Sequence, residues 1–271
     1  MADALVAAGY MTECSQMFLV ARRNAFDSTL QGLGYEKSNI DDVVKMTWEA
    51  LEAVIVTWTK AFRHAINVGL STEHELCTRV FAGRHAAVGH DIFVDLSRCV
   101  MLHMLSFTEA VAMIKRTTKK LFKVLDMYEA VRDTSQVIEA FMSADEPAAA
   151  EHHSHHSGLA ELKSEIAAVR SQLGESAVAI FRELESSIRA DAGKQPVPSG
   201  VVHPLTPYVM NYLKYACEYN STLEQVFREL HHGNRDDSNP FAADSATSSE
   251  RVELCGKERN FPNPKKIRSK Y

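Results

Sequence analysis

Four histidines lie in one short segment and are the side chains best suited to bind a metal ion. His152, His153, His155 and His156 fall within residues 143–158, a stretch rich in Ala, Ser and Glu. Zinc accepts imidazole nitrogens, but a structural zinc site draws four ligands from a folded frame. We therefore interpret the segment as a low-complexity linker, with adventitious metal binding as the alternative, and predict no cofactor.

Catalytic motifs are missing from the rest of the sequence. Glu73-His74-Glu75 lacks the second histidine of a zinc-protease HExxH motif, and Cys77 would need a base held close to it. There is no P-loop, dinucleotide fingerprint, GxSxG or kinase motif. The sequence predicts a protein that acts by binding and has no catalytic residue. An enzyme with a cryptic cysteine or histidine site is the less favoured alternative.

Two basic clusters are suited to contact an anionic surface. The first lies within six residues and contains Lys115, Arg116, Lys119 and Lys120. The second lies near the C-terminus and contains Lys265, Lys266, Arg268 and Lys270. Clustered Lys and Arg attract anionic lipid headgroups, although salt weakens this attraction for a short exposed cluster. We name these eight residues as candidate lipid or partner contacts, with a solvated turn between helices as the alternative for the first cluster.

The composition is that of a chain with a hydrophobic core. Hydrophobic residues make up 45% of the 271 residues, and the formal net charge of −5 argues against a nucleic-acid-binding protein. No apolar run approaches the roughly 20 residues that span a bilayer, and the first residues lack the basic region of a secretory signal. Five scattered cysteines without a CxxC pair then indicate reduced thiols in the cytoplasm.

Helical periodicity predicts an all-α fold. No proline precedes Pro147, and apolar residues such as Leu51, Ile55, Trp58 and Phe62 recur at spacings of three and four. We expect helices over about residues 3–33, 40–46, 47–68, 71–83, 91–116, 119–132, 135–142, 159–188, 205–219 and 221–230. We further expect Gly34 to end the first helix and Asn39 to begin the second.

These elements divide the chain into four parts. We expect a helical bundle over residues 1–142, the His-rich linker over 143–158, a continuing bundle over 159–230 and a tail over 231–271. The tail is polar and contains three prolines, so we expect it to be disordered.

Three sets of segments resemble the plant branch of the family of the 70 kDa subunit of the exocyst. The first set comprises residues 8–14 (AGYMTEC), 20–23 (VARR) and 33–37 (LGYEK). The second comprises residues 48–52 (WEALE), 107–112 (FTEAVA) and 120–130 (KLFKVLDMYEA). The third comprises residues 196–198 (PVP) and 202–213 (VHPLTPYVMNYL). Their shared order over about residues 4–230 makes the resemblance specific.

The resemblance implies an elongated rod of stacked antiparallel helix pairs, acting as a scaffold that tethers secretory vesicles to the plasma membrane in exocytosis. Its implied partners are other exocyst subunits, small GTPases of the Rho type and phosphoinositide lipid. The implied location is cytoplasmic, peripherally at the plasma membrane or on secretory vesicles.

Several departures from the family pattern bear on these expectations. The family is more than twice this length, so we expect the chain to lack its N-terminal helices and its C-terminal bundle, which carries the main lipid-binding surface. We also expect the family pattern to end after Phe227. A degenerate paralogue that acts as a non-tethering binder or decoy in plant immunity is therefore the alternative function.

Overall fold

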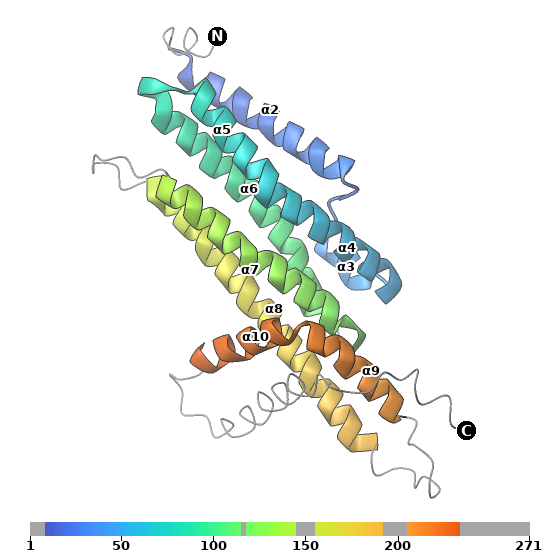
Figure 1. The fold of residues 1–271 in the computed structure, drawn as a ribbon. Coiled ribbons are helices and arrows are strands. Elements are labelled where there is room, and N and C mark those ends of the chain that lie inside the picture. The colour runs from blue at the N-terminus through green and yellow to red at the C-terminus, as the bar shows by residue number, and fades with distance from the viewer. Residues whose placement is uncertain (1–8, 115–117, 145–154, 192–204, 234–271) are drawn as a thin grey trace, which may run out of the picture. The chain divides into compact units, whose positions relative to one another are not determined.

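The computed structural model describes residues 9–114, 118–144, 155–191 and 205–233. Within these ranges every regular element is a helix, which confirms the all-α prediction (Figure 1). The expected tail lies almost wholly outside the described residues, as do His152 and His153 of the linker. Contacts between residues divide the chain into two compact units. Unit 1 comprises Met1–Lys115 and Asp126–Leu173, and unit 2 comprises Arg116–Leu125 and Gly174–Tyr271.

The described elements of unit 1 are helices on both sides of the His-rich segment. They are α2 (Met11–Gly32), α3 (Ile40–Lys45), α4 (Trp48–His64), the π-helical η1 (Ala65–Leu70), α5 (Ser71–Val80), the 3-10 turn η2 (Gly83–His85), α6 (Ala86–Met113), α7 (Leu121–Ala144) from residue 126 and α8 (His155–Asp191) as far as residue 173. The sequence places a division at the linker, whereas the contacts divide the chain within α7 and α8. One of the contacts that join α7 and α8 in unit 1 is the ion pair from Lys163 Nζ to Glu139 Oε1, at 2.7 Å.

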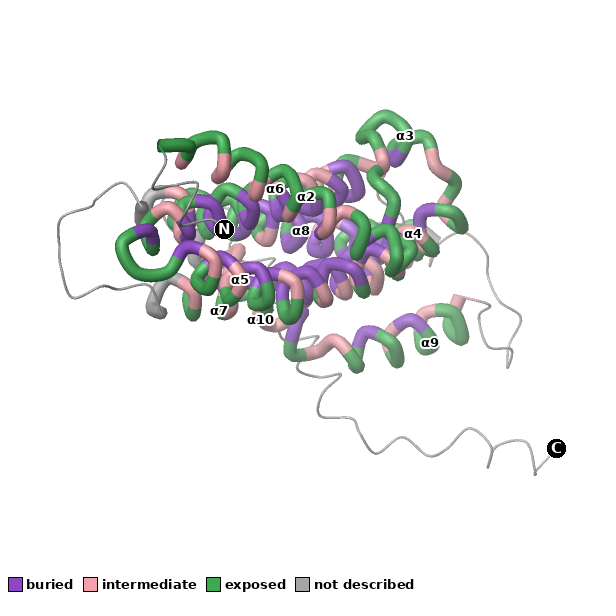
Figure 2. Tube along the Cα trace, turned by 90° about the horizontal axis from the view of Figure 1, so that it is seen from above, coloured by how far each residue is buried: buried purple, intermediate pink, exposed green. Residues whose placement is uncertain are grey.

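Helix α6 forms the centre of unit 1. It contacts α2, α3 and α5, and buried residues occur along its whole length (Figures 1 and 2). Helices α4 and α5 run antiparallel to it: Trp58 Nε1 donates a hydrogen bond to the Met104 carbonyl at 3.0 Å, while Gly89 lies against Cys77 and Phe81 at the other end. The helix pairing implied by the resemblance is thus seen within this unit.

Residues 48–80 form one continuous helical segment, so the expected break before Ser71 is wrong. The Ser71 and Thr72 hydroxyls do not cap a new helix; they donate back to the carbonyls of Asn67 and Val68, at 3.5 and 2.8 Å. Such i−4 bonds leave the backbone helical, and the wider turn of η1 carries the chain through.

The expected break near residue 134 is also absent, for the same physical reason. Thr134 is buried and its hydroxyl donates to the Ala130 carbonyl at 3.0 Å, so α7 continues from Leu121 to Ala144. Helix α8 also continues without interruption, through Gly174, although glycine has a low helix propensity. Hydroxyl-bearing residues inside a buried helix bond to the preceding turn, which a prediction based on capping residues does not anticipate.

The end of α2 agrees with the sequence. Gly34 has a φ of 84°, its amide donates to the Gln31 carbonyl at 2.8 Å, and the Tyr35 amide donates to the Leu30 carbonyl at 3.0 Å. This is the Schellman pattern, with buried Leu30 and Tyr35 at the positions where an apolar contact usually accompanies it. Asn39 also occupies the predicted N-cap position of α3, although its side chain makes no capping hydrogen bond.

Unit 2 contains short pieces of helix from distant parts of the chain. Its described elements are the 3-10 turn η3 (Thr118–Lys120), the start of α7, the end of α8, α9 (Leu205–Glu218) and α10 (Asn220–Gly233). Phe181 of α8 and Phe227 of α10 pack edge to face with ring centroids 6.1 Å apart. Pro207 lies in the first turn of α9, where a backbone amide has no acceptor within the helix, so the proline is tolerated there.

Candidate functional site

The first basic cluster is only partly available at the surface. Lys115 and Arg116 lie outside the described residues, Lys119 is exposed, and Lys120 is buried. Burial lowers the pKa of the Lys120 ammonium, because removal from water disfavours the charged form. Of the two described lysines, only Lys119 presents an accessible charge, so a contact by Lys120 is not supported.

The second basic cluster cannot be placed. Lys265, Lys266, Arg268 and Lys270 all lie outside the described residues, and their role stays a prediction.

The residues considered for chemistry are arranged for packing. Cys77 is buried, and burial together with the charge of Glu73 raises the pKa of its thiol to about 11, the opposite of what a nucleophile requires. His74 lies against the rings of Phe93 and Phe141, with centroids 4.9 and 5.3 Å away. In the part of the chain that the structure describes, no three His, Cys, Asp or Glu residues are grouped to hold a metal ion.

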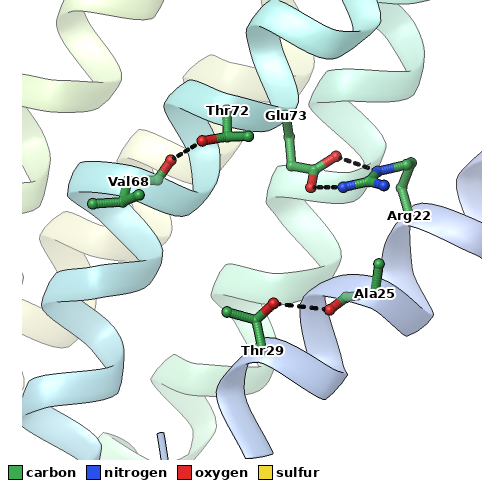
Figure 3. Close-up of polar contacts among 6 residues, drawn as sticks. All are labelled: Arg22, Ala25, Thr29, Val68, Thr72 and Glu73. Atoms are coloured by element: carbon green, nitrogen blue, oxygen red, sulfur yellow. Dashed lines mark hydrogen bonds and ion pairs between the residues drawn. The ribbon is translucent and has the colours of Figure 1, made fainter. Parts of the chain in front are cut away.

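Helix α2 is held on unit 1 by three regularly spaced side chains, Phe18, Arg22 and Phe26. Figure 3 shows the central contact, in which Arg22 donates through Nε and Nη2 to the two carboxylate oxygens of Glu73, at 2.8 and 2.6 Å. Glu73 is buried, and its hydrogen bond raises the pKa of the Arg22 guanidinium. A bidentate pair of this kind fixes orientation as well as distance.

The two phenylalanines flank this ion pair on either side. Phe18 packs edge to face on Phe81, with centroids 5.2 Å apart, and Phe26 covers the backbone at Gly69 in η1. A Cβ at position 69 would lie 2.6 Å from Cζ of Phe26, so the close approach depends on glycine. Positions 18, 22 and 26 thus meet positions 81, 73 and 69, and α2 runs antiparallel to η1 and α5. We call these contacts the α2 clamp.

The opposite side of α2 carries exposed apolar side chains. Met17 is 75% and Val20 58% exposed, and Ala21 next to them is also exposed. Single exposed apolar residues are ordinary, but neighbours on one helix side form a surface suited to a partner helix. This outer side is separate from the clamp.

The corresponding feature of unit 2 is a row of tyrosines along α9 and at the residue that follows it. Tyr212, Tyr215 and Tyr219 surround Phe122 of α7, with ring centroids 5.0, 5.9 and 5.6 Å from it. The Tyr212 hydroxyl donates to the Thr118 carbonyl at 3.0 Å. Burial raises the pKa of that hydroxyl, so it stays protonated as a donor.

Tyr208 completes the row. Its hydroxyl lies 3.2 Å from Oγ1 of Thr118, and its ring lies beside that of Tyr212. Tyr208 and Tyr215 nevertheless remain 49% and 47% exposed. We call Phe122 and these four tyrosines the tyrosine edge.

Comparison with known proteins identifies the family. Residues 56–258 match the family model that describes the C-terminal part of Exo70, a component of the exocyst complex. The chain belongs to the Exo70 family.

Several curated Exo70 proteins are similar to most of this chain. Exocyst complex component EXO70C1 of Arabidopsis thaliana is 42% identical over 240 residues, 88% of this chain. EXO70C2 and EXO70B1 of the same plant are 41% and 37% identical over 93% and 84% of the chain. The chain spans about a third of the length of these relatives, 34 to 35% of each.

The Exo70 match corrects one expectation. It continues to residue 258, beyond Phe227, where we expected the family pattern to end. Earlier in the chain, the apolar spacing of the helices makes the family similarity evident. The segment after Phe227 is polar and lacks this spacing. In the described parts of this Exo70 chain, no helix has the length and apolar character needed to cross a membrane.

The sequence indicates some of these features and not others. The tyrosine spacing in α9 is visible in the sequence, which predicts a helix there. The partner ring Phe122 lies some 90 residues earlier, and the sequence offers no signal for this contact. The Arg22–Glu73 pair joins positions 51 residues apart, for which a single sequence offers no signal.

Proposed function

We propose that this Exo70-family chain acts as an exocyst-subunit-like scaffold in the tethering of secretory vesicles to the plasma membrane during exocytosis. The observation that carries the proposal is the 41 to 42% identity, over most of the chain, to proteins named as exocyst complex components. The fold suits such a role, because amphipathic helices packed through one side leave the other for partner helices.

The proposed partners follow from the same family membership. Other exocyst subunits are the main partners, with small GTPases and phosphoinositide-containing membranes as additional ones. The chain would then act in the cytoplasm, peripherally at the plasma membrane or on secretory vesicles. For lipid or partner contact we retain Lys115, Arg116, Lys119 and the four basic residues at 265–270, and we leave out buried Lys120.

The test is affinity purification of the tagged chain from plant cells, with mass spectrometry to identify other exocyst subunits. A matched negative control is Gly89→Val, because a Cβ at this position would lie 2.9 Å from Cβ of Phe81 and 3.0 Å from the Cys77 carbonyl oxygen. We expect exocyst subunits with the unmodified chain and not with this misfolded variant.

The opposite result would also be informative. If the chain is expressed and folded but recovers no exocyst subunit, the tethering function is wrong. A binder that acts outside the complex, such as a decoy in plant immunity, then becomes the better hypothesis.

A further inference from the structure

The tyrosine edge combines features that a packing cluster alone does not need. The rings of Tyr208 and Tyr215 are about half exposed although they contact their neighbours. The exposed Lys119 directly follows Thr118, which hydrogen-bonds to both Tyr208 and Tyr212. In the described part of unit 2, the large hydrophobic residues with high exposure are Tyr208, Met210 and Tyr215, all on α9.

Met210 is not part of this surface. It is two residues from Tyr208, which places it roughly 160° around the helix from that ring. Tyr208 and Tyr215, seven residues apart, lie on one side of α9 together with buried Tyr212. The edge therefore presents two rings with their hydroxyl groups on one side of α9. The exposed Lys119 is next in sequence to Thr118, which hydrogen-bonds to Tyr208 and Tyr212.

We propose that the tyrosine edge binds a short amphipathic segment of another exocyst subunit, which lays apolar side chains on Tyr208 and Tyr215 and places a carboxylate beside Lys119. This proposal rests on the proposed function and names the kind of partner for one surface. Tyrosine rings offer apolar contact area at low entropic cost, and their hydroxyls, like the lysine, can donate to a carboxylate.

The size of the surface argues against a second copy of this chain as the occupant. A fully buried tyrosine covers about 200 Å², so two half-exposed rings offer about 200 Å² together. A stable dimer buries about 800 Å² on each partner. A single peptide segment that adds contacts of its own along α9 fits this area better.

The charge argues against a membrane. Lipid-binding surfaces usually cluster four to eight Lys or Arg residues. Here Lys120 is buried, and the exposed charges on η3 and α9 include Glu218 as well as Lys119 and Lys214. Two exposed lysines on the described residues of η3 and α9 are fewer than such a lipid-binding cluster contains, so this surface is better matched to a carboxylate on a peptide.

The experiment uses the full chain and overlapping synthetic peptides that cover the other exocyst subunits of the same plant. Binding is compared for the unmodified chain, Tyr215→Ala, Lys119→Glu and the matched control Met210→Ala, which removes an equally exposed side chain from another side of α9. Hydrogen exchange of α9 in each variant checks that the helix remains folded.

We expect acidic amphipathic peptides to bind the unmodified chain, with at least tenfold weaker binding to Tyr215→Ala and Lys119→Glu and unchanged binding to Met210→Ala. Replacing the carboxylate of a bound peptide with lysine should restore binding to Lys119→Glu. The proposal is wrong if no such peptide binds, or if Tyr215→Ala and Met210→Ala have the same effect.

Two further measurements distinguish a peptide from a membrane or a second copy of the chain as the occupant of the tyrosine edge. Vesicles of phosphatidylcholine with phosphatidylserine and phosphatidylinositol bisphosphate should bind the unmodified chain and Tyr215→Ala equally, and sedimentation should show equal self-association. Loss of either property in Tyr215→Ala would assign the edge to a membrane or to a second copy instead. If Tyr215→Ala and Lys119→Glu recover exocyst subunits as well as the unmodified chain does, this inference fails while the proposed function stands.

Discussion

The α2 clamp of unit 1 and the tyrosine edge of unit 2 each hold a helix in place, but they use side chains differently. In the clamp, Phe18, Arg22 and Phe26 face inward, while the exposed Met17 and Val20 lie on the opposite side of α2. In the edge, the same row of tyrosines both packs on Phe122 and remains partly exposed.

This difference has a practical consequence. Anchoring and display are carried by separate residues in α2, so each can be changed without the other. In α9 the same tyrosine rings pack on Phe122 and are partly exposed. A change that removes a hydroxyl group and keeps the ring is therefore needed to test anchoring alone.

Phe26→Ala should destabilise unit 1 by about 4 kcal/mol, because it leaves a cavity over Gly69 and removes the buried ring. Urea unfolding followed by tryptophan fluorescence reports on this unit, since both tryptophans, Trp48 and Trp58, lie in it. The matched control Met17→Ala should change the free energy of unfolding by less than about 0.5 kcal/mol. Equal effects of the two substitutions would contradict the assignment of inner and outer sides.

Cysteine modification contrasts the interior of unit 1 with the surface of α9. At pH 8, iodoacetamide should modify exposed Cys217 and leave buried Cys77 unmodified. Since the Cys77 pKa is raised from 9.0 to about 11, ionisation alone reduces its thiolate about 100-fold. Peptide mapping by mass spectrometry measures both sites, and modification of Cys77 at the rate of Cys217 in the folded chain would refute its burial.

The same pKa shift gives a pH dependence of stability. The folded chain holds the Cys77 proton more tightly than the unfolded chain does, so this contribution is complete below about pH 9 and is lost as the pH rises towards 11. In Cys77→Ser, the decline in unfolding free energy over this range should be smaller than in the unmodified chain.

Tyr212→Phe should have the smallest effect, a loss of about 1 kcal/mol, because it removes one hydrogen bond to the Thr118 carbonyl and keeps the ring. Hydrogen exchange of the α9 amides should become about fivefold faster, as 1.4 kcal/mol corresponds to a factor of ten. The control Tyr215→Phe removes the hydroxyl of an exposed ring and should leave exchange nearly unchanged. A larger effect of the control would place the anchoring bond elsewhere on α9.

The sequence predicts the helices well where local chemistry decides them. Gly34 ends α2 because glycine accepts a positive φ, and the stripe from Leu51 to Phe62 is buried because its spacing matches the helical period. The expected breaks before Ser71 and near residue 134 are wrong, because the hydroxyls of Ser71 and Thr134 bond back to the preceding turn. A hydroxyl can either cap a helix or bond back within one, and tertiary packing decides between these outcomes.

The candidate surfaces could be predicted less completely. The exposure of Lys119 and the burial of Lys120, two adjacent lysines, depend on which way η3 turns against its neighbours. The clamp and the tyrosine edge each depend on contacts between residues about 50 and 90 positions apart. Such contacts are set by the fold as a whole and leave no periodic pattern in one sequence.

The π-helical turn η1 affects how residues 48–80 can change in length. A π turn holds one more residue than an α turn, so Ala65–Leu70 is equivalent to an α-helix that has gained a single amino acid. Deleting exposed Asn67 would allow a regular α-helix through this region, with the preceding and following segments keeping their own partners on α6 and α2. A one-residue deletion should therefore be tolerated here and be disruptive within α4 or α5, where it would rotate every later side chain by about 100°.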